Sequence, residues 1–437
     1  MRNRSLLMTA TFLGLAGPSL ADGPPTVPVT RPEMKQFLEN SKRNKPRLPL
    51  PELTAEEHEK AGKGDWSVVN NGRMRKFYLP AEVTGAGFLR EPDPAMTLGY
   101  PFQTMIFWIV SRCNNCTYCM GHQETKLTAA GLSEERIAAL DGDWSEFTEA
   151  ERTAFGFARK LTLTPERVTA DDVEGLRRFY TEAQILEILL VTGNFNAMNR
   201  WTGALKIPQE DHRVYLTETP AKYRATASRV APLDPARHDS ASSLAGPSRR
   251  PPLESKAEVE AALADCRART PILPLVDEAK ARAILPADWP SGPLPEWVRL
   301  LATFPKAGLA RIELHRGAEE KGTLDARLKA EIAYTAARRD RAWYALGHAR
   351  ERLAALGFSD DQIDALDGPL DAFPPAERAT LAMARKLTTD PALIGDDDVA
   401  ALRAQLSDKQ TAEVIHHVTE AAFFDRVTEA ARLRLED

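Results

Sequence analysis

The chain has 437 residues, with 57 basic and 62 acidic side chains and a formal net charge of −5. This length allows two or three domains, each able to bury a hydrophobic core of its own. The charge is small and negative, and no basic stripe with interleaved aromatic residues occurs, so the composition argues against nucleic acid as a partner.

The amino terminus has the pattern of a secretory signal peptide. Two arginines precede an apolar run of about a dozen residues, and Ser19-Leu20-Ala21 follows as a cleavage site of small residues. The run is too short to cross a bilayer core of roughly 30 Å, and the Pro-rich segment after it favours a mature terminus over a buried first helix. We therefore expect a signal peptide over residues 1–21 and a periplasmic or secreted protein. In such a compartment a close cysteine pair rests as a disulfide unless a donor reduces it.

Composition and hydrophobic periodicity divide the rest of the chain into four parts. No hairpin signal interrupts the helical spacing, and Ser133, Thr148, Thr169 and Thr181 stand where helix N-caps are expected. The predicted class is therefore all-α. The parts are a Pro-rich extension over 22–95, a helical domain over 96–210, a linker over 211–290 with one helix near 254–268, and a second helical domain over 291–437.

The two predicted domains repeat one pattern without gaps. A shift of 226 positions brings Gly121-His122 onto Gly347-His348 and keeps its register over roughly a hundred residues. Such similarity predicts a tandem duplication, because the period is too long for a solenoid repeat. We expect the two copies to cover each other's apolar faces within one chain. Further shared positions, in the numbers of the first copy, are Leu140–Gly142, Ala158–Thr162, Asp171–Val173, Gln184, Glu187 and Arg200.

The first copy carries a cysteine cluster that the second copy lacks. Cys113, Cys116, Cys119 and His122 lie within ten residues, and the chain has one other cysteine, Cys266. The equivalent positions in the second copy hold Arg339, Ala342 and Ala345. The shared residues therefore indicate fold, and the unshared cysteines indicate function.

The spacing places the thiols at a helix start. The sequence predicts a helix over 102–112, a break at Asn114-Asn115 and a second helix over 116–130. Unpaired N–H groups and the helix dipole favour an anion in the first turn, so the thiol pKa should fall there. His122, one turn after Cys119, could act as its base, and the second cysteine could resolve a sulfenic acid. We expect Cys119 to attack and Cys116 to resolve; the reverse order fits if Cys116 is the more exposed.

These residues also carry a family resemblance. The strings NCTYCMGHQE, FARKLT, DDVEGLRRFYTEAQILEI and NFNAMNR resemble the alkylhydroperoxidase D-like, or carboxymuconolactone decarboxylase, family, over 96–210 strongly and over 295–437 more weakly. The resemblance implies helical bundles that commonly form homo-oligomers. It also implies antioxidant peroxidase activity of the peroxiredoxin type through a redox-active disulfide, with Cys116, Cys119 and His122 as catalytic residues. A peroxide or disulfide substrate and a thiol electron donor would be the partners, without a metal or an organic cofactor.

Two departures from the family pattern concern the acid–base groups. The family's histidine commonly lies at the position of Gln123, one residue after His122. Its proton-relay glutamate has no counterpart, because Thr104 and its neighbour occupy that place, although Glu331 lies near the equivalent place in the second copy. Glu124 could substitute if its side chain turned toward the thiols.

Alternatives to redox chemistry remain open. Cys113, Cys116, Cys119 and His122 could form a Cys₃His metal site, although ligands from one short segment need a loop rather than a continuing helix. The pair could also be a structural disulfide, or the chain a lactone decarboxylase. We expect His348 to be a packing or capping residue, and His416 and His417 to face solvent. We also expect the Asn199-Arg200 motif to take part in a structural ion pair rather than a substrate contact, and Cys266 to be a plain surface or semi-buried thiol. Cys113 is either a third redox thiol or a small buried hydrophobe.

Overall fold

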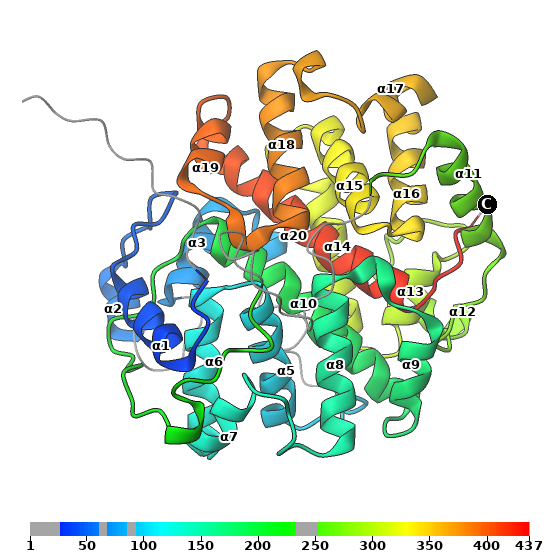
Figure 1. Cartoon of the computed structure of the whole chain (residues 1–437). Coiled ribbons are helices and arrows are strands. Elements are labelled where there is room, and N and C mark those ends of the chain that lie inside the picture. Colours follow the sequence, from blue (N-terminus) through cyan, green and yellow to red (C-terminus); the bar gives the residue numbers. More distant parts are fainter. Residues whose placement is uncertain (1–26, 61–67, 85–92, 233–251, 437) are drawn as a thin grey trace, which may run out of the picture.

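The computed structural model describes residues 27–60, 68–84, 93–232 and 252–436, and within these ranges the fold is all-helical, as expected (Figure 1). The expected signal peptide over 1–21 lies outside the described residues. No helix of the described ranges is long and apolar enough to cross a membrane.

A first series of helices holds the cysteine cluster. Ser133, Thr148 and Thr181 cap helices through side-chain hydrogen bonds to the third backbone N–H, and Thr169 forms a capping box, so the expected helix starts are confirmed. The series consists of α5 (Tyr100–Cys113), α6 (Thr117–Ala129), α7 (Glu134–Ala139), α8 (Glu149–Leu163), α9 (Ala170–Arg177) and α10 (Glu182–Ala204).

A second series follows the first at a constant offset. Each of its helices begins and ends 226 residues after its counterpart, except that the first of them ends one residue later. The series consists of α15 (Ala326–Asp340), α16 (Trp343–Ala355), α17 (Asp360–Ala365), α18 (Pro375–Thr389), α19 (Asp396–Arg403) and α20 (Asp408–Ala430).

The correspondence extends beyond the predicted domains. The amide of Arg47 donates to the carbonyl of Leu205 at 3.0 Å, and the amide of Ile272 donates to that of Ala431 at 3.0 Å. α1 packs on α6, and α11, the helix expected near 254–268, packs on α16. The flanking helices are α1 (Arg31–Asn40), α2 (Ala55–Lys60), α3 (Asn70–Tyr78), α4 (Ala81–Thr84), α11 (Lys256–Ala268), α12 (Glu278–Arg282), α13 (Glu296–Leu301) and α14 (Ala307–Glu320).

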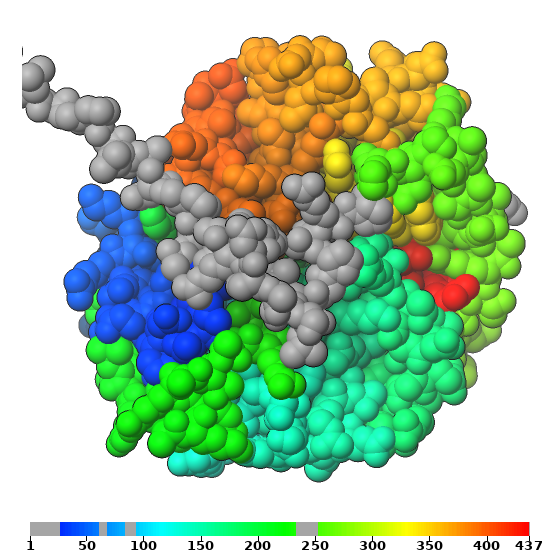
Figure 2. Space-filling view, viewed as in Figure 1, coloured from blue at the N-terminus to red at the C-terminus, as the bar shows by residue number. Residues whose placement is uncertain are grey.

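The two series meet along α10 and α20, which lie together at the centre of the molecule (Figure 1). Gly193 allows this close approach, because a Cβ at its position would lie 2.8 Å from a methyl group of Val427. Arg200, fully buried, donates to the carbonyls of Leu387 at 3.1 Å and Thr388 at 2.9 Å. On the face shown in Figure 2 the two series form opposite ends of one body.

The packing of α20 corrects one expectation. His416 and His417 do not face solvent: they are 2% and 6% exposed, because α20 packs against helices of both series. The ring of His416 meets that of Trp201 edge-on at 6.1 Å. Burial lowers the pKa of both histidines well below the ordinary value, so both imidazoles are neutral near neutral pH.

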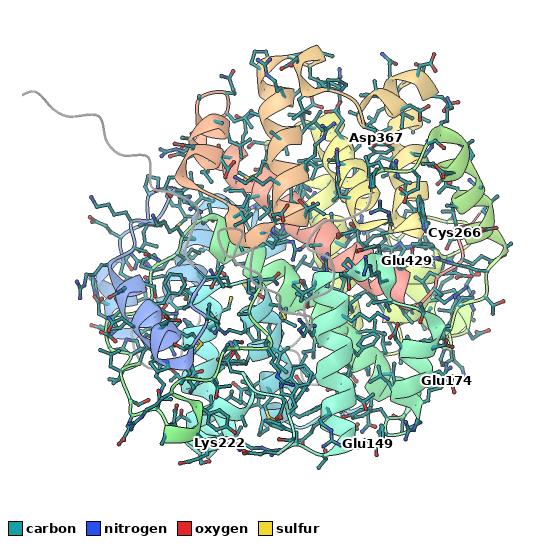
Figure 3. The ribbon with its side chains drawn as sticks, viewed as in Figure 1. Glu149, Glu174, Lys222, Cys266, Asp367 and Glu429 are labelled. Atoms are coloured by element: carbon teal, nitrogen blue, oxygen red, sulfur yellow. The ribbon has the colours of Figure 1, made fainter. Side chains whose placement is uncertain are left out.

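Cys266 is more deeply buried than expected, with 1% of its surface exposed, so it is a structural thiol. It lies on α11 near the carboxyl end of α20, where Figure 3 labels it beside Glu429. The backbone carbonyl of Cys266 accepts a hydrogen bond from the amide of Leu435. In the part of the chain around the first series, the carbonyl of Ser41 accepts the equivalent bond from the amide of Gln209. Cys266 thus takes the place of a buried serine, and burial raises the pKa of its thiol to about 11.

Candidate functional site

Cys116 is the N-cap of α6. The chain leaves α5 at Asn114, passes through Asn115 in the left-handed region at φ 50°, and enters α6 with Cys116 in extended conformation. The amide of Cys119 donates to Cys116 Sγ at 3.4 Å, the bond that a capping serine or threonine would accept. In the second series the N-cap is Ala342, whose side chain makes no such bond. The backbone at this helix start therefore does not depend on the thiols.

One hydroxyl joins the two thiols. Thr202 Oγ1, near the end of α10, lies 3.0 Å from Cys116 Sγ and 3.2 Å from Cys119 Sγ. Because both sulfurs lie within hydrogen-bonding distance of the same oxygen, they are close neighbours. All four cysteines of the chain are free thiols. The site is therefore a reduced dithiol.

The two thiols differ in acidity. Burial opposes ionisation of Cys116, but hydrogen bonds from Cys119 and Thr202 and from backbone amides of the first turn outweigh it and lower the pKa of Cys116. Burial, together with the neighbouring Cys116, raises the pKa of Cys119 well above its ordinary value. Cys116 is thus the thiol that ionises first.

Both ring nitrogens of His122 contact groups other than the thiols. Its Nε2 lies 2.8 Å from Glu210 Oε2, and its Nδ1 lies 3.2 Å from Arg213 Nη2. Arginine has only donors, so Nδ1 accepts, Nε2 donates, and the ring is neutral. Burial lowers the pKa of His122, and the charge of Arg213 lowers it as well, whereas Glu210 acts in the opposite direction. With both nitrogens occupied, His122 does not serve as a base for Cys119 in this arrangement, contrary to the expectation from sequence.

Glu210 is the centre of this cluster, and the sequence analysis missed it. It accepts from the Tyr118 hydroxyl at 2.8 Å, the Asn70 amide at 3.2 Å and Arg213 Nε at 3.1 Å. Burial opposes its ionisation, but the bonds from His122 and Tyr118 and the charge of Arg213 lower the pKa of Glu210 to about 2. The carboxylate thereby ties the chain after α10 to the first turns of α6.

The second series repeats this cluster without the thiols. Tyr344 donates to Glu436 at 2.9 Å, and His348 lies 3.1 Å from the same carboxylate. These residues follow Tyr118, Glu210 and His122 by 226 positions each. The offset is the signal that could have revealed Glu210. Since the cluster persists where the thiols do not, its first role is to hold the fold, as expected for His348.

A pocket of about 330 Å³ opens beside the dithiol. Cys119 and His122 form part of its wall, together with Lys126 and the rings of Phe107 and Phe195. Cys116 is not part of the wall. Cys119 is therefore the thiol that a small substrate in this pocket would meet.

The other candidates lie elsewhere. Cys113 packs in the core on the far side of α5, where burial raises the pKa of its thiol to about 12, so it is a buried hydrophobe. No group of three or more metal-ligating side chains forms within the described ranges. The Cys₃His alternative fails in geometry, because Cys113 is in the core and His122 is bound to Glu210.

Neither Glu124 nor Glu331 takes the place of the relay glutamate beside the thiols. Glu124 receives two bonds from Arg31, at 3.1 and 2.9 Å, and one from Trp108 Nε1 at 2.7 Å, so it does not turn toward the pair. Glu331 belongs to α15, where it pairs with Arg327 at 2.8 Å, and burial raises its pKa to about 7. Asn199 donates to Ser111 Oγ at 3.1 Å, and with Arg200 it is part of the packing.

No family model and no curated protein matches the chain. Among solved structures, a variant of the debrominase Bmp8 in complex with 2,3,4-tribromopyrrole is similar to part of it, with 18% identical residues and a TM-score of 0.31. The match covers 42% of this chain and 90% of that chain. A TM-score this low supports neither a common fold nor a shared activity.

Proposed function

We propose that the protein is a thiol-dependent oxidoreductase that reduces hydroperoxides through Cys116 and Cys119. The observation that carries the proposal is the pair of reduced thiols that share the Thr202 hydroxyl at a helix start, with Cys119 on the wall of a pocket. A structural disulfide would need neither a pocket nor a stabilised thiolate.

We further propose that the chain is a tandem duplication of an alkylhydroperoxidase D-like unit. The helix bounds and hydrogen bonds that recur at the constant offset support it. In this arrangement the second copy covers α10 of the first through α20, and α10 carries Thr202.

The proposed reaction uses the two thiols as a proton-sharing pair. Cys116 is the thiol that ionises first, and its thiolate accepts the proton of Cys119 as the Cys119 sulfur attacks the outer peroxide oxygen. The O–O bond breaks, the alcohol leaves with a proton from water, and Cys119 becomes a sulfenic acid. Cys116 then attacks that sulfur, and its proton leaves with the hydroxyl as water. One hydroperoxide and two thiols give one alcohol, one water and one disulfide, which a dithiol donor reduces.

The remaining groups of the site have supporting roles in this proposal. His122 and Lys126 shape the pocket, and Glu210 holds His122 in place through the bond at 2.8 Å. An external dithiol is required because a periplasmic or secreted location, which we also propose, would otherwise leave the pair oxidised.

Thiol titration before and after one equivalent of hydrogen peroxide tests the proposal. The reduced protein has four free thiols, and we expect two to disappear per peroxide. Cys119→Ser should abolish this stoichiometric loss, whereas Cys113→Ser, which removes a neighbouring buried thiol, should leave it intact. Thiols that ignore both peroxide and disulfide reagents would falsify the redox function.

A further inference from the structure

A second pocket, of about 250 Å³, lies in the second series at the place that the thiol pocket occupies in the first. Its wall includes Ala345 and His348, which follow Cys119 and His122 by 226 positions. The second pocket is thus the thiol-free counterpart of the first, and the proposed peroxide reduction does not use it.

The second pocket has been reshaped rather than filled. Ala333 and Ala421 stand where the larger Phe107 and Phe195 line the first pocket. Phe424 in turn replaces the smaller Met198. A domain kept only for packing would close such a space with aliphatic side chains, because interiors are close-packed.

Imidazoles make up part of the new wall. Three of the chain's eight histidines, His315, His348 and His417, line this one pocket. His417 stands where the first series has Val191, which is fully buried in the core. Replacing a buried valine by a histidine costs stability unless the ring gains a hydrogen-bond partner.

Two residues of this wall have a polar atom without a hydrogen-bond partner among the described residues. They are Asp425, which is 2% exposed and whose Oδ2 has no partner, and His315, whose Nδ1 has none. Burial, together with the charge of Asp340, raises the pKa of Asp425 well above its ordinary value, which favours the protonated carboxyl. Burial lowers the pKa of His315 to about 4, so this imidazole is neutral near neutral pH.

The charged groups of the pocket are already paired. Arg311 binds Glu420 at 2.6 Å, and Arg352 forms an ion pair with Glu319. The ammonium group of Lys329 donates to backbone carbonyls at the end of α14, including that of Ala318 at 3.0 Å. No group of three or more metal ligands forms among the described residues. These pairings leave the imidazoles and the Asp425 carboxyl, rather than the paired charges, to bind a ligand.

Aromatic rings form another side. Phe424 stacks on His315 with centroids 4.8 Å apart and an interplanar angle of 14°, and Trp297 meets both rings edge-on at 5.7 and 5.0 Å. Flat walls of this kind favour a planar ring. The volume is below the roughly 300–1,000 Å³ of pockets for drug-sized ligands.

We propose that the second pocket binds a small, uncharged hydroxy-aromatic molecule of the phenol class, with its ring against Trp297 and Phe424 and its hydroxyl toward His417 and Asp425. The hydroxyl both donates and accepts, so it can pair with an imidazole nitrogen and with a carboxyl oxygen. The site is separate from the dithiol and has no thiol of its own.

Calorimetric titration of the full chain with phenol tests this proposal. We expect one phenol per chain in the second pocket, with an affinity reduced at least about tenfold by His417→Val, which restores the residue of the first series. Phe424→Met restores the residue type of Met198 in the first series and keeps an apolar side chain. This variant provides the test of the site if His417→Val does not fold. Cys119→Ala, the matched change in the first pocket, should leave binding unchanged.

Absence of phenol binding would overturn the proposal. So would an affinity that both second-pocket variants leave unchanged, or one that Cys119→Ala abolishes, because the phenol would then occupy the thiol pocket. Peroxide-dependent loss of thiols is measured separately, so failure of the phenol site is distinguishable from failure of the redox function.

Discussion

Replacing Thr202 by valine should slow the reaction of the dithiol with peroxide by about fivefold. The hydroxyl lies 3.0 Å from Cys116 Sγ and 3.2 Å from Cys119 Sγ, and it donates to the Met198 carbonyl at 2.9 Å. The Thr202 hydroxyl has one proton, so it can donate to the Cys116 thiolate only when it no longer donates to the Met198 carbonyl. A hydrogen bond to a charged group contributes about 1.5–3 kcal/mol and a neutral one about 0.5–1.5 kcal/mol. The thiolate therefore gains about 1 kcal/mol more from this hydrogen bond than the neutral thiol does, which corresponds to about a fivefold change in the thiolate population.

The assay is the rate of thiol loss after addition of hydrogen peroxide to the reduced protein at a fixed pH near neutrality. Thr428→Val is the matched control, because Thr428 follows Thr202 by 226 positions and donates to the Phe424 carbonyl at 2.8 Å in the thiol-free series. It should cost similar stability and leave the rate unchanged. A Thr202→Val protein that reacts at the wild-type rate, or a Thr428→Val protein that slows equally, would refute this account of the thiolate.

Three further predictions concern stability. The pKa of Glu210 is lowered from 4.5 to about 2, so its carboxylate stabilises the fold above pH 4.5 and loses this effect as the pH falls toward 2. The difference in unfolding free energy between wild type and Glu210→Gln, measured by urea unfolding, should therefore become smaller over that range. A difference that stays constant would contradict this prediction. Arg200→Ala leaves two buried carbonyls of α18 without hydrogen-bond donors. It should lower the unfolding free energy by about 2–4 kcal/mol. A loss below about 0.5 kcal/mol would show that the packing of the two series does not depend on this contact. Cys266→Ser should change stability by less than about 1 kcal/mol, because Ser41 occupies the equivalent place; a larger loss would argue against that equivalence.

The sequence predicted the helix start of the site well because its signals are local. Asn114 and Asn115 favour a break with an asparagine as the cap, and the helix was expected to begin at Cys116; in the structure Cys116 is itself the N-cap and α6 begins one residue later, at Thr117. Asp340 and the left-handed Arg341 mark the same break in the second series. Capping and turn preferences depend on neighbouring residues, so they can be inferred without the tertiary fold.

The groups around the thiols could not be predicted in this way. Glu210 lies in a loop after α10 and meets His122 only because that loop folds back over α6. The orientation of His122 follows from Glu210 and Arg213, so helical spacing alone gave it the wrong neighbour. His416 and His417 were misplaced because α20 is covered on several sides, which periodicity within one helix does not reveal.

Peptide mapping of the protein by mass spectrometry, before and after one equivalent of hydrogen peroxide, tests the central claim most directly. We expect the peptide that contains Cys116 and Cys119 to lose two hydrogens, with Cys113 and Cys266 remaining as thiols, and a dithiol reductant to restore the original mass. A disulfide between other cysteines, oxygen added without a disulfide, or an unchanged mass would contradict the assignment of Cys116 and Cys119 as the redox pair.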